Sequence, residues 1–374
     1  MTTPTTIDEY LEGFSDEPGY LDFARRGAIG RAARDEESAM SSLLGRSRYG
    51  TLDTLDEQDA RVRDAVATLT RFRADQVVFQ PNTSQGLMHV MFGLEGEIAL
   101  SPAEFPSNTF AVSRAADALG VVTPRWLETD HGRVTPGNLR EQLTPETTAV
   151  VVSLVDYRTG YLVDLEGIRQ VIGDRLLIVD AIQGFGVVDA PYEVADVVVS
   201  GGQKWVRAGW GTGFLAISDR ALDRITPVFS GFNATDADGT PVEVLPPTHG
   251  AAAFSISNPD PIAQARFAAA LEGIADVGVP AINARLAEKA SSIIDLADEF
   301  ALEVRSSRNE AERAGIIIVA PEADQLTMLA ASLHNHGVTV TARDGYVRMS
   351  PHVTTDEETL AMLRASLISF ATAI

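Results

Sequence analysis

An aspartate and a lysine lie close together in the sequence, each following a short apolar segment. Asp180 follows Leu176–Val179, and Lys204 comes shortly after Val197–Val199. Short runs rich in valine and isoleucine are typical of strands buried in a parallel sheet. The carboxyl ends of such strands share one edge of the sheet, where ligands bind. The pattern therefore predicts that Asp180 and Lys204 lie side by side at that edge.

The pairing of an acid with a lysine suits the cofactor pyridoxal phosphate (PLP). A lysine holds this cofactor as a Schiff base, and an acid beside the ring nitrogen allows the ring to accept electrons. A helix-capping Asp180 and a solvated surface Lys204 are the alternative. The surroundings of Lys204 favour the cofactor, because the lysine lies in Gly201–Trp205, between a predicted buried strand and the glycine-rich turn Gly209–Gly213.

A site for an anion is predicted where the strand expected at Val77–Gln80 leads into the helix expected at Leu87–Leu94. The connection between them contains Thr83 and Ser84. Backbone N–H groups and the helix dipole attract anions at the start of a helix. Alternatively, Thr83 and Ser84 are simple N-cap residues.

These motifs resemble those of the class V aminotransferase family of fold-type I PLP enzymes, which includes cysteine desulfurases, kynureninases and isopenicillin N epimerase. The resemblance extends from about Tyr20 to the C-terminus, and the motifs follow the family's order. It implies that Lys204 forms the internal aldimine with PLP and that Asp180 holds the pyridinium nitrogen. The other implied cofactor contacts are Thr83, Ser84 and Gln203 at the phosphate, Phe105 stacked on the ring, Gln183 at the 3-oxygen, and Asn258 reaching the phosphate of a neighbouring subunit.

The sequence departs from the family pattern at two of these places. Asn258 stands where relatives usually carry threonine, and Tyr157 stands where desulfurases place an asparagine near the 3-oxygen. The loop Asp156–Tyr161 resembles that of kynureninases more than that of desulfurases. Gln183 is therefore expected to serve the 3-oxygen alone.

An arginine is expected to bind the substrate's carboxylate. In the family, the arginine of the motif Tyr346–His352 binds the α-carboxylate, so the resemblance gives this role to Arg348. A guanidinium group matches a carboxylate with two parallel hydrogen bonds. Arg158 is a second candidate for substrate binding, although it could instead pair with Asp156 within its loop. The next candidates are Arg25, Arg26 and Arg46.

The remaining elements alternate between strands and helices, which predicts a doubly wound α/β sheet. The resemblance implies a large domain with a mainly parallel seven-stranded sheet flanked by helices, and a smaller α+β domain at the C-terminus. We expect residues 1–20 to form an arm on the small domain, residues 21–258 the PLP-binding domain and residues 259–374 the small domain. Strands are also predicted at Tyr20–Ala24 and Val338–Val340, and a loop across a dimer interface is predicted for residues 230–250.

The composition indicates in which cellular compartment the protein lies and which classes of partner are disfavoured. The 374 residues carry a formal net charge of −22, which disfavours nucleic acid and anionic membranes as partners. The apolar runs are too short to cross a bilayer, and the polar, acidic N-terminus is unlike a signal peptide. We therefore expect a cytoplasmic protein without a metal. The resemblance predicts a homodimer with active sites at the subunit interface.

The cofactor residues do not distinguish among the family's reactions, because transamination, side-chain cleavage and epimerisation share a carbanion at Cα. The chain contains no cysteine, which excludes the thiol-dependent mechanism of a cysteine desulfurase. We therefore predict an enzyme acting on an amino acid, either an aminotransferase or a lyase that cleaves a C–S or C–C bond, similar to kynureninase or a cysteine-sulfoxide lyase. An epimerase of the isopenicillin N type and a non-catalytic binding protein are the alternatives.

Overall fold

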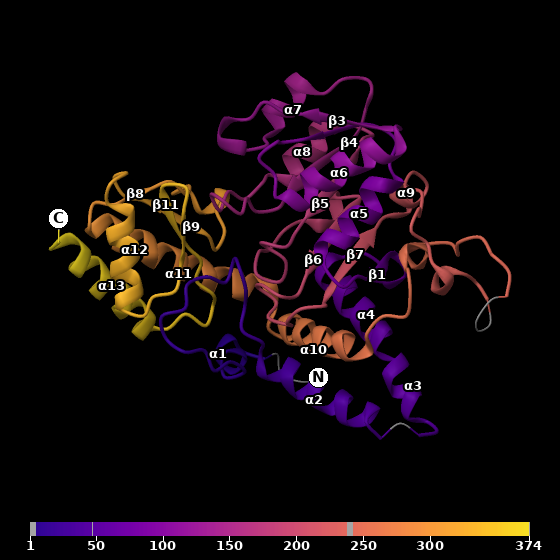
Figure 1. Cartoon of the computed structure of the whole chain (residues 1–374), viewed down its shortest axis with the longest axis horizontal. Helices are drawn as coiled ribbons and strands as arrows, with labels where there is room; N and C mark the ends of the chain where they lie inside the picture. The colour runs from indigo at the N-terminus through magenta and orange to yellow at the C-terminus, as the bar shows by residue number, and fades with distance from the viewer. Residues whose placement is uncertain (1–4, 47, 238–241, 374) are drawn as a thin grey trace.

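The computed structural model describes residues 5–46, 48–237 and 242–373. Two sheets, each accompanied by helices, make up most of this part of the chain (Figure 1). The predicted loop 230–250 includes residues 238–241, which lie outside the described residues, as do residues 1–4 of the predicted arm. Within the described ranges, no single helix is long and apolar enough to span a membrane. Helices α10 (Pro261–Val277) and α11 (Val279–Glu299) pass that test only together, and they are bent by 86°.

Seven strands form the large sheet, and they are β1 (Val77–Phe79), β2 (Gly96–Leu100), β3 (Val122–Trp126), β4 (Thr147–Ser153), β5 (Leu176–Asp180), β6 (Val197–Gly201) and β7 (Gly213–Ile217). Their order is β1-β7-β6-β5-β4-β2-β3. Five adjacent strands run parallel to one another, namely β6, β5, β4, β2 and β3. Strand β7 is antiparallel to both of its neighbours, β6 and β1. Every residue of β5, β6 and β7 is buried, which explains their nearly continuous apolar sequences. The prediction of a mainly parallel seven-stranded sheet is confirmed.

Helices cover both faces of this sheet, and they are α4 (Gln58–Thr70), α5 (Thr83–Gly93), α6 (Pro106–Leu119), α7 (Pro136–Gln142), α8 (Leu165–Ile172) and α9 (Asp219–Leu222), together with α10. Alternate side chains of a strand point to opposite faces. In β5, Leu177 and Val179 pack in one core with residues of α4, α8 and α10, whereas Leu176 and Ile178 pack in another with residues of α5 and α6. The sheet is therefore buried on both sides.

Four antiparallel strands form the small sheet, and they are β8 (Glu303–Val304), β9 (Ile317–Ala320), β10 (Thr341–Arg343) and β11 (Tyr346–Met349). Their order is β10-β11-β9-β8, and a separate core joins β8, β9 and β11 to α11, α12 (Leu326–Asn335) and α13 (Glu357–Ala371). Three helices precede α4 in the described chain, namely α1 (Ile7–Leu11), α2 (Arg31–Leu44) and α3 (Thr51–Asp56), and α2 packs along α10 (Figure 1).

The prediction of strands at Tyr20–Ala24 and Val338–Val340 is wrong. The N-terminal segment passes between the loop before β10 and the end of β11, and it pairs for only one residue on each side. The isolated bridges join Tyr20 to Thr339 and Asp22 to Ser350. A single residue pair on each flank is too short to form a ladder. These bonds nevertheless fix the segment against the small sheet.

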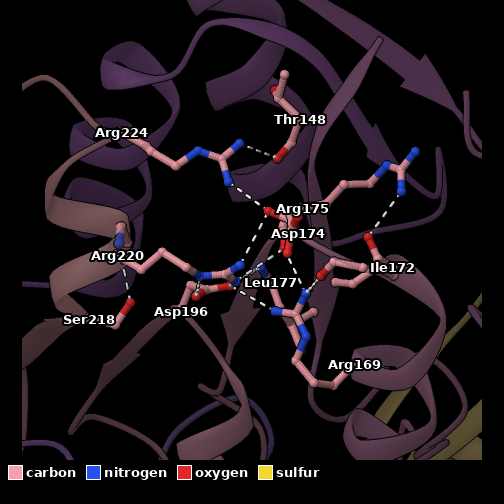
Figure 2. Close-up of polar contacts among 12 residues, drawn as sticks. Thr148, Arg169, Ile172, Asp174, Arg175, Leu177, Asp196, Ser218, Arg220 and Arg224 are labelled. Carbon is pink, nitrogen blue, oxygen red and sulfur yellow. Dashed lines mark hydrogen bonds and ion pairs between the residues drawn. The ribbon is translucent and has the colours of Figure 1, made fainter. Parts of the chain in front are cut away.

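A cluster of arginines joins the loops at the amino ends of the strands, opposite the predicted site (Figure 2). Asp196, just before β6, accepts hydrogen bonds from Arg169 of α8 and Arg220 of α9, both at 2.9 Å. Arg220 and Arg224 also donate to the backbone carbonyl of Asp174, which precedes β5. These charges find their partners within the chain, so the cluster acts as a scaffold that fixes where β5 and β6 begin.

Candidate active site

A cavity of about 480 Å³ lies where β5 and β6 end. It brings together eight of the ten predicted site residues, which are Thr83, Ser84, Phe105, Asp180, Gln183, Gln203, Lys204 and Arg348. Arg348 belongs to β11 of the small sheet, whereas the others belong to the large sheet and its connections. The cavity therefore lies between the two sheets.

A tight turn after β6 holds Lys204 at the cavity. The N–H of Gly202 donates to Thr212 O at 2.9 Å, and the N–H of Ala208 donates to Gly202 O at 2.8 Å, so the chain doubles back around the lysine. Burial lowers the pKa of the Lys204 amine to about 8, against the opposing charge of Asp180. A larger neutral fraction near pH 7 makes the amine a better nucleophile.

Asp180 is a buried carboxyl group at the end of β5. Its Oδ1 accepts a hydrogen bond from the Ile182 N–H at 3.1 Å, and its Oδ2 accepts one from Asn108 Nδ2 at 3.3 Å. Burial raises the pKa of Asp180 to about 6, although these hydrogen bonds and the charge of Lys204 oppose the shift. The site is therefore short of positive charge beside this acid, and a protonated ring nitrogen would supply it.

The start of α5 forms the predicted phosphate end of the cavity. Asn82, rather than Thr83 or Ser84, is the N-cap, and its side chain accepts a hydrogen bond from the Gln85 N–H at 2.9 Å. The Thr83 hydroxyl is buried and has no hydrogen-bond partner among the described residues. Because buried polar groups are normally paired, this hydroxyl at a helix N-terminus marks a place for an anionic group.

Gln203 points toward the same place. An added Cβ at Gly201 would lie 2.5 Å from Gln203 Oε1 and 3.1 Å from Thr83 Oγ1, so these two side chains converge beside Gly201. Ser84 Oγ lies 2.7 Å from Ser107 Oγ, and both serines line the cavity. The unpaired hydroxyl, the amide and the helix N-terminus together fit a phosphate group.

Two aromatic rings and a fixed amide shape the rest of the cavity. Lys204 Nζ lies 5.4 Å from the centroid of the Phe105 ring, and Tyr157 packs edge-on against Phe105 with centroids 5.1 Å apart. Gln183 Oε1 accepts a hydrogen bond from Trp205 Nε1 at 2.9 Å, and Gln183 Nε2 donates to a backbone carbonyl at 3.0 Å. Gln183 Nε2 carries a second hydrogen, which is compatible with the predicted contact to the cofactor's 3-oxygen.

Arg348 is buried and already has a carboxylate partner. Its Nη2 lies 3.2 Å from Oδ1 of Asp22, and its Nη1 donates to the backbone carbonyl of Tyr157 at 3.1 Å. The Nε atom is buried and has no partner within the described part of the chain. The contacts to Asp22 and Tyr157 orient the guanidinium group at the cavity.

The geometry of this cavity agrees with what comparison with known proteins shows. The family model for class V aminotransferases matches residues 31–373. The chain belongs to this family. The family's cofactor is PLP, and the chain is accordingly a PLP-dependent enzyme of fold type I.

Two curated relatives of this chain are named as different kinds of enzyme. A kynureninase of Deinococcus radiodurans is 27% identical over 68% of this chain and 63% of its own length, so the match spans less than two thirds of that relative. An uncharacterized aminotransferase of Bacillus subtilis, YcbU, is 24% identical over 79% of each chain. The two names differ, and neither assigns the reaction of this chain.

Solved class V structures share the whole fold. An apo cysteine desulfurase from Thermococcus onnurineus NA1 has a TM-score of 0.87 at 19% identity and covers 100% of both chains. A mutant of C-DES, with glycine covalently linked to its PLP cofactor, has a TM-score of 0.87 at 20% identity and covers 97% of this chain and 99% of its own. At such identities the likeness establishes the fold alone.

Two predicted site residues of the family pattern lie outside the cavity. Arg158 forms an ion pair with Asp156 at 3.0 Å and lines another pocket. Asn258 lines a groove of about 1030 Å³ beside α3 and β1. The chain therefore does not bring Asn258 to its own Lys204, and the prediction that it serves a neighbouring subunit stays a prediction.

Several residues that shape the cavity are not among those predicted from the sequence. Two of them are buried polar residues: Asp22 contacts Arg348, and Asn108 contacts Asp180. Arg25, a secondary candidate for binding the carboxylate, and Arg343, which no motif indicates, both line the cavity. The signal available for Asp22 was an acid inside the apolar stretch Tyr20–Ala24, where a charge needs a partner.

Proposed function

We propose that this PLP enzyme acts on an α-amino acid and either transfers its amino group or cleaves a C–S or C–C bond in its side chain. The observation that carries the proposal is the meeting of Lys204 and Arg348 in one cavity. A lysine amine and a guanidinium group suit a ligand that has an amino group and a carboxylate. Kynureninase-like and cysteine-sulfoxide-lyase-like reactions both fall within this proposal.

Bound PLP supplies an electron sink for the bond broken at Cα. Thr83, Ser84 and Gln203 would hold its phosphate, and the carboxylate of Asp180 would keep its ring nitrogen protonated. Lys204 Nζ, with its pKa lowered to about 8, takes and returns the proton at Cα. Arg348 would fix the α-carboxylate and so orient the substrate's Cα in the cavity.

The absence of cysteine favours these reactions over thiol-dependent desulfuration. A desulfurase of that type transfers sulfur to a cysteine of its own chain, and none of the 374 residues is a cysteine. A lyase that releases sulfur from its substrate without a thiol is compatible with this composition, as is transamination. The chain's own residues therefore support a lyase or an aminotransferase.

We further propose that the enzyme is a homodimer. The groove lined by Asn258 also contains Leu52 and Ile256, whose side chains remain 55% and 43% exposed in the single chain. Apolar surface of this kind is typical of an interface between subunits. Sedimentation of the holoenzyme would test the proposal, and Ile256→Glu should shift the mass from a dimer toward a monomer. A monomeric wild-type protein would contradict it.

A panel of amino acids tests the reaction. The holoenzyme would be incubated with each one and assayed for keto acid, sulfur species and alanine, with Lys204→Ala as the inactive control. Arg348→Lys keeps the charge but loses the planar fork, so kcat/KM for the reactive amino acid should fall by at least roughly tenfold. Amines without a carboxylate should be much less affected. Equal losses for amines and amino acids would contradict the role of Arg348.

A further inference from the structure

We propose that the substrate amino acid carries a second acidic group on its side chain, and that Arg343 and Arg25 bind this group. The proposal rests on the proposed function, because it takes Arg348 as the partner of the α-carboxylate. The substrate class is α-amino acids whose side chain ends in a carboxylate, sulfinate, sulfonate or phosphate. These groups share the chemistry that a guanidinium fork recognises.

Arg343 reaches the cavity from the strand next to that of Arg348. Thr341 and Arg343 both line the cavity, as expected for residues two apart on one face of a strand. In the register of the small sheet, Thr341 lies opposite Arg348, and Arg343 lies opposite Tyr346. The backbone positions of the two arginines are therefore about two residues apart along the sheet, roughly 7 Å. One small ligand can contact both long side chains.

The aromatic ring of Tyr157 supports Arg343 at this position. The Arg343 Cζ atom lies 5.7 Å from the ring centroid, while the backbone carbonyl of Tyr157 accepts the hydrogen bond from Arg348 Nη1. A guanidinium group stacked on an aromatic face keeps the N–H groups at its edge available. Tyr157 thus contacts Arg343 through its ring and Arg348 through its backbone carbonyl, beside the same cavity.

Arg25 and Arg343 differ from the other arginines around the site in their charge balance. Three neighbouring arginines are paired with carboxylates, in the pairs Arg348–Asp22, Arg158–Asp156 and Arg207–Asp16. Arg25 lines the cavity with an exposed side chain, and that side chain makes no hydrogen bond or ion pair with another described residue; only its backbone N–H is bonded, to the carbonyl of Asp22. Arg343 forms an ion pair with Asp344, with Nε 3.6 Å from Oδ2. The Asp344 side chain is 74% exposed, so this ion pair is screened by solvent.

Arg25 and Arg343 place two largely uncompensated positive charges at one cavity of a chain whose formal net charge is −22. An anionic ligand would explain this arrangement. The cofactor's phosphate is not that ligand, because the features that fit phosphate lie at Thr83 and the start of α5. The α-carboxylate is assigned to Arg348. A second acidic group on the substrate accounts for both remaining cations. Their positive charge would also attract such a substrate toward the cavity.

A specificity experiment tests the proposal. The wild-type holoenzyme would be given aspartate, cysteine sulfinate and phosphoserine, with asparagine, alanine and serine as neutral counterparts, and kcat and KM would be measured for each. We expect at least one acidic amino acid to exceed its neutral counterpart by at least roughly tenfold in kcat/KM. The acidic group that gives the largest preference identifies the side chain.

Variants show whether the two arginines cause this preference. In Arg343→Gln and Arg25→Gln, the ratio of kcat/KM for the acidic over the neutral amino acid should fall by roughly tenfold, mainly through KM. Arg26→Gln is the matched control, because Arg26 is an exposed neighbour of Arg25 that does not line the cavity. The ratio should be the same in this control as in the wild type.

A binding measurement gives a readout other than turnover. Succinate and glutarate should raise the Tm of the wild-type holoenzyme more than acetate at the same concentration and ionic strength, and Arg343→Gln should remove that difference. A preference for neutral amino acids, or an unchanged ratio in both arginine variants, would overturn the proposal while leaving the proposed function intact. A holoenzyme that turns over no amino acid of either kind would overturn both.

Discussion

Nη2 of Arg348 lies 3.2 Å from Oδ1 of Asp22, and both side chains are buried. Asp22 also accepts hydrogen bonds from Thr341 Oγ1 at 2.9 and 3.0 Å. An acid from the N-terminal segment therefore orients the arginine that we assign to the substrate's carboxylate. The position of residues 20–24 against the small sheet is thus linked directly to the geometry of the cavity.

Asp22→Asn should destabilise the protein and make it more responsive to ligand. Removing one partner of a buried ion pair leaves the other charge uncompensated, so the free energy of unfolding should fall by about 3 kcal/mol or more. A carboxylate ligand bound at Arg348 should restore part of that loss. Urea unfolding with and without a substrate amino acid would measure both effects. Thr341→Val, which keeps both charges, is the control and should cost about 1 kcal/mol. If ligand stabilised the variant and the wild type equally, Arg348 would not be the carboxylate site.

Asp180→Asn should stabilise the apoprotein at neutral pH. The pKa of Asp180 is raised from 3.8 to about 6, so the folded apoprotein binds this proton more tightly than the unfolded chain does. Stability conferred by this group is present below about pH 4 and is lost as pH rises through 6. At pH 7 the amide variant should therefore be more stable by up to about 3 kcal/mol, with the gain disappearing below pH 4. Unfolding of both apoproteins as a function of pH measures this gain. A gain that did not vary with pH would show that burial does not raise the pKa of the Asp180 carboxyl.

The same substitution should damage the holoenzyme. An amide cannot keep the ring nitrogen protonated, so removal of the Cα proton should slow by at least roughly tenfold. The kinetic isotope effect of a Cα-deuterated substrate, measured in the wild type and the variant, would show whether that step limits turnover. An unchanged rate of proton removal would place the ring-nitrogen partner elsewhere in the cavity.

Thr83→Val should weaken cofactor binding without weakening the fold. Valine keeps the shape of the side chain and removes a hydroxyl that has no partner among the described residues, so the free energy of unfolding should stay within about 1 kcal/mol. The affinity for PLP should fall by roughly tenfold, measured by titrating the apoprotein with cofactor. Ser84→Ala is the comparison and should lower the affinity for PLP less than Thr83→Val does, because the Ser84 hydroxyl already contacts that of Ser107 at 2.7 Å. Wild-type affinity in Thr83→Val would place the phosphate away from α5.

The features predictable from the sequence were those that depend on local pattern. The apolar runs of β5 and β6 identify buried parallel strands, and the residues that follow such strands necessarily meet at one edge. Asp180 and Lys204 could therefore be placed together from their positions in the chain. The turn into α5 was predictable for the same reason, since a strand leads directly into a helix there.

The features missed depend on long-range register or on choices that local preference leaves open. Asp22 and Arg348 are 326 positions apart, and only the packing of the N-terminal segment on the small sheet brings them together. Arg343 could be assigned to the cavity only once the pairing of β10 with β11 was known. Asn82, Thr83 and Ser84 are all favourable N-cap residues, so the sequence did not indicate that Asn82 takes the cap.

The most direct test of this account is the identity of the lysine that binds PLP. The chain contains two lysines, Lys204 in the cavity and Lys289 on α11, where it lies 3.6 Å from Glu357. Borohydride reduction of the holoenzyme followed by peptide mapping should attach the cofactor to Lys204. Lys204→Ala should abolish the covalent link, and Lys289→Ala should retain it. Label on Lys289, or no label in PLP-loaded protein, would contradict the assignment of Lys204 and with it the active site described for this chain.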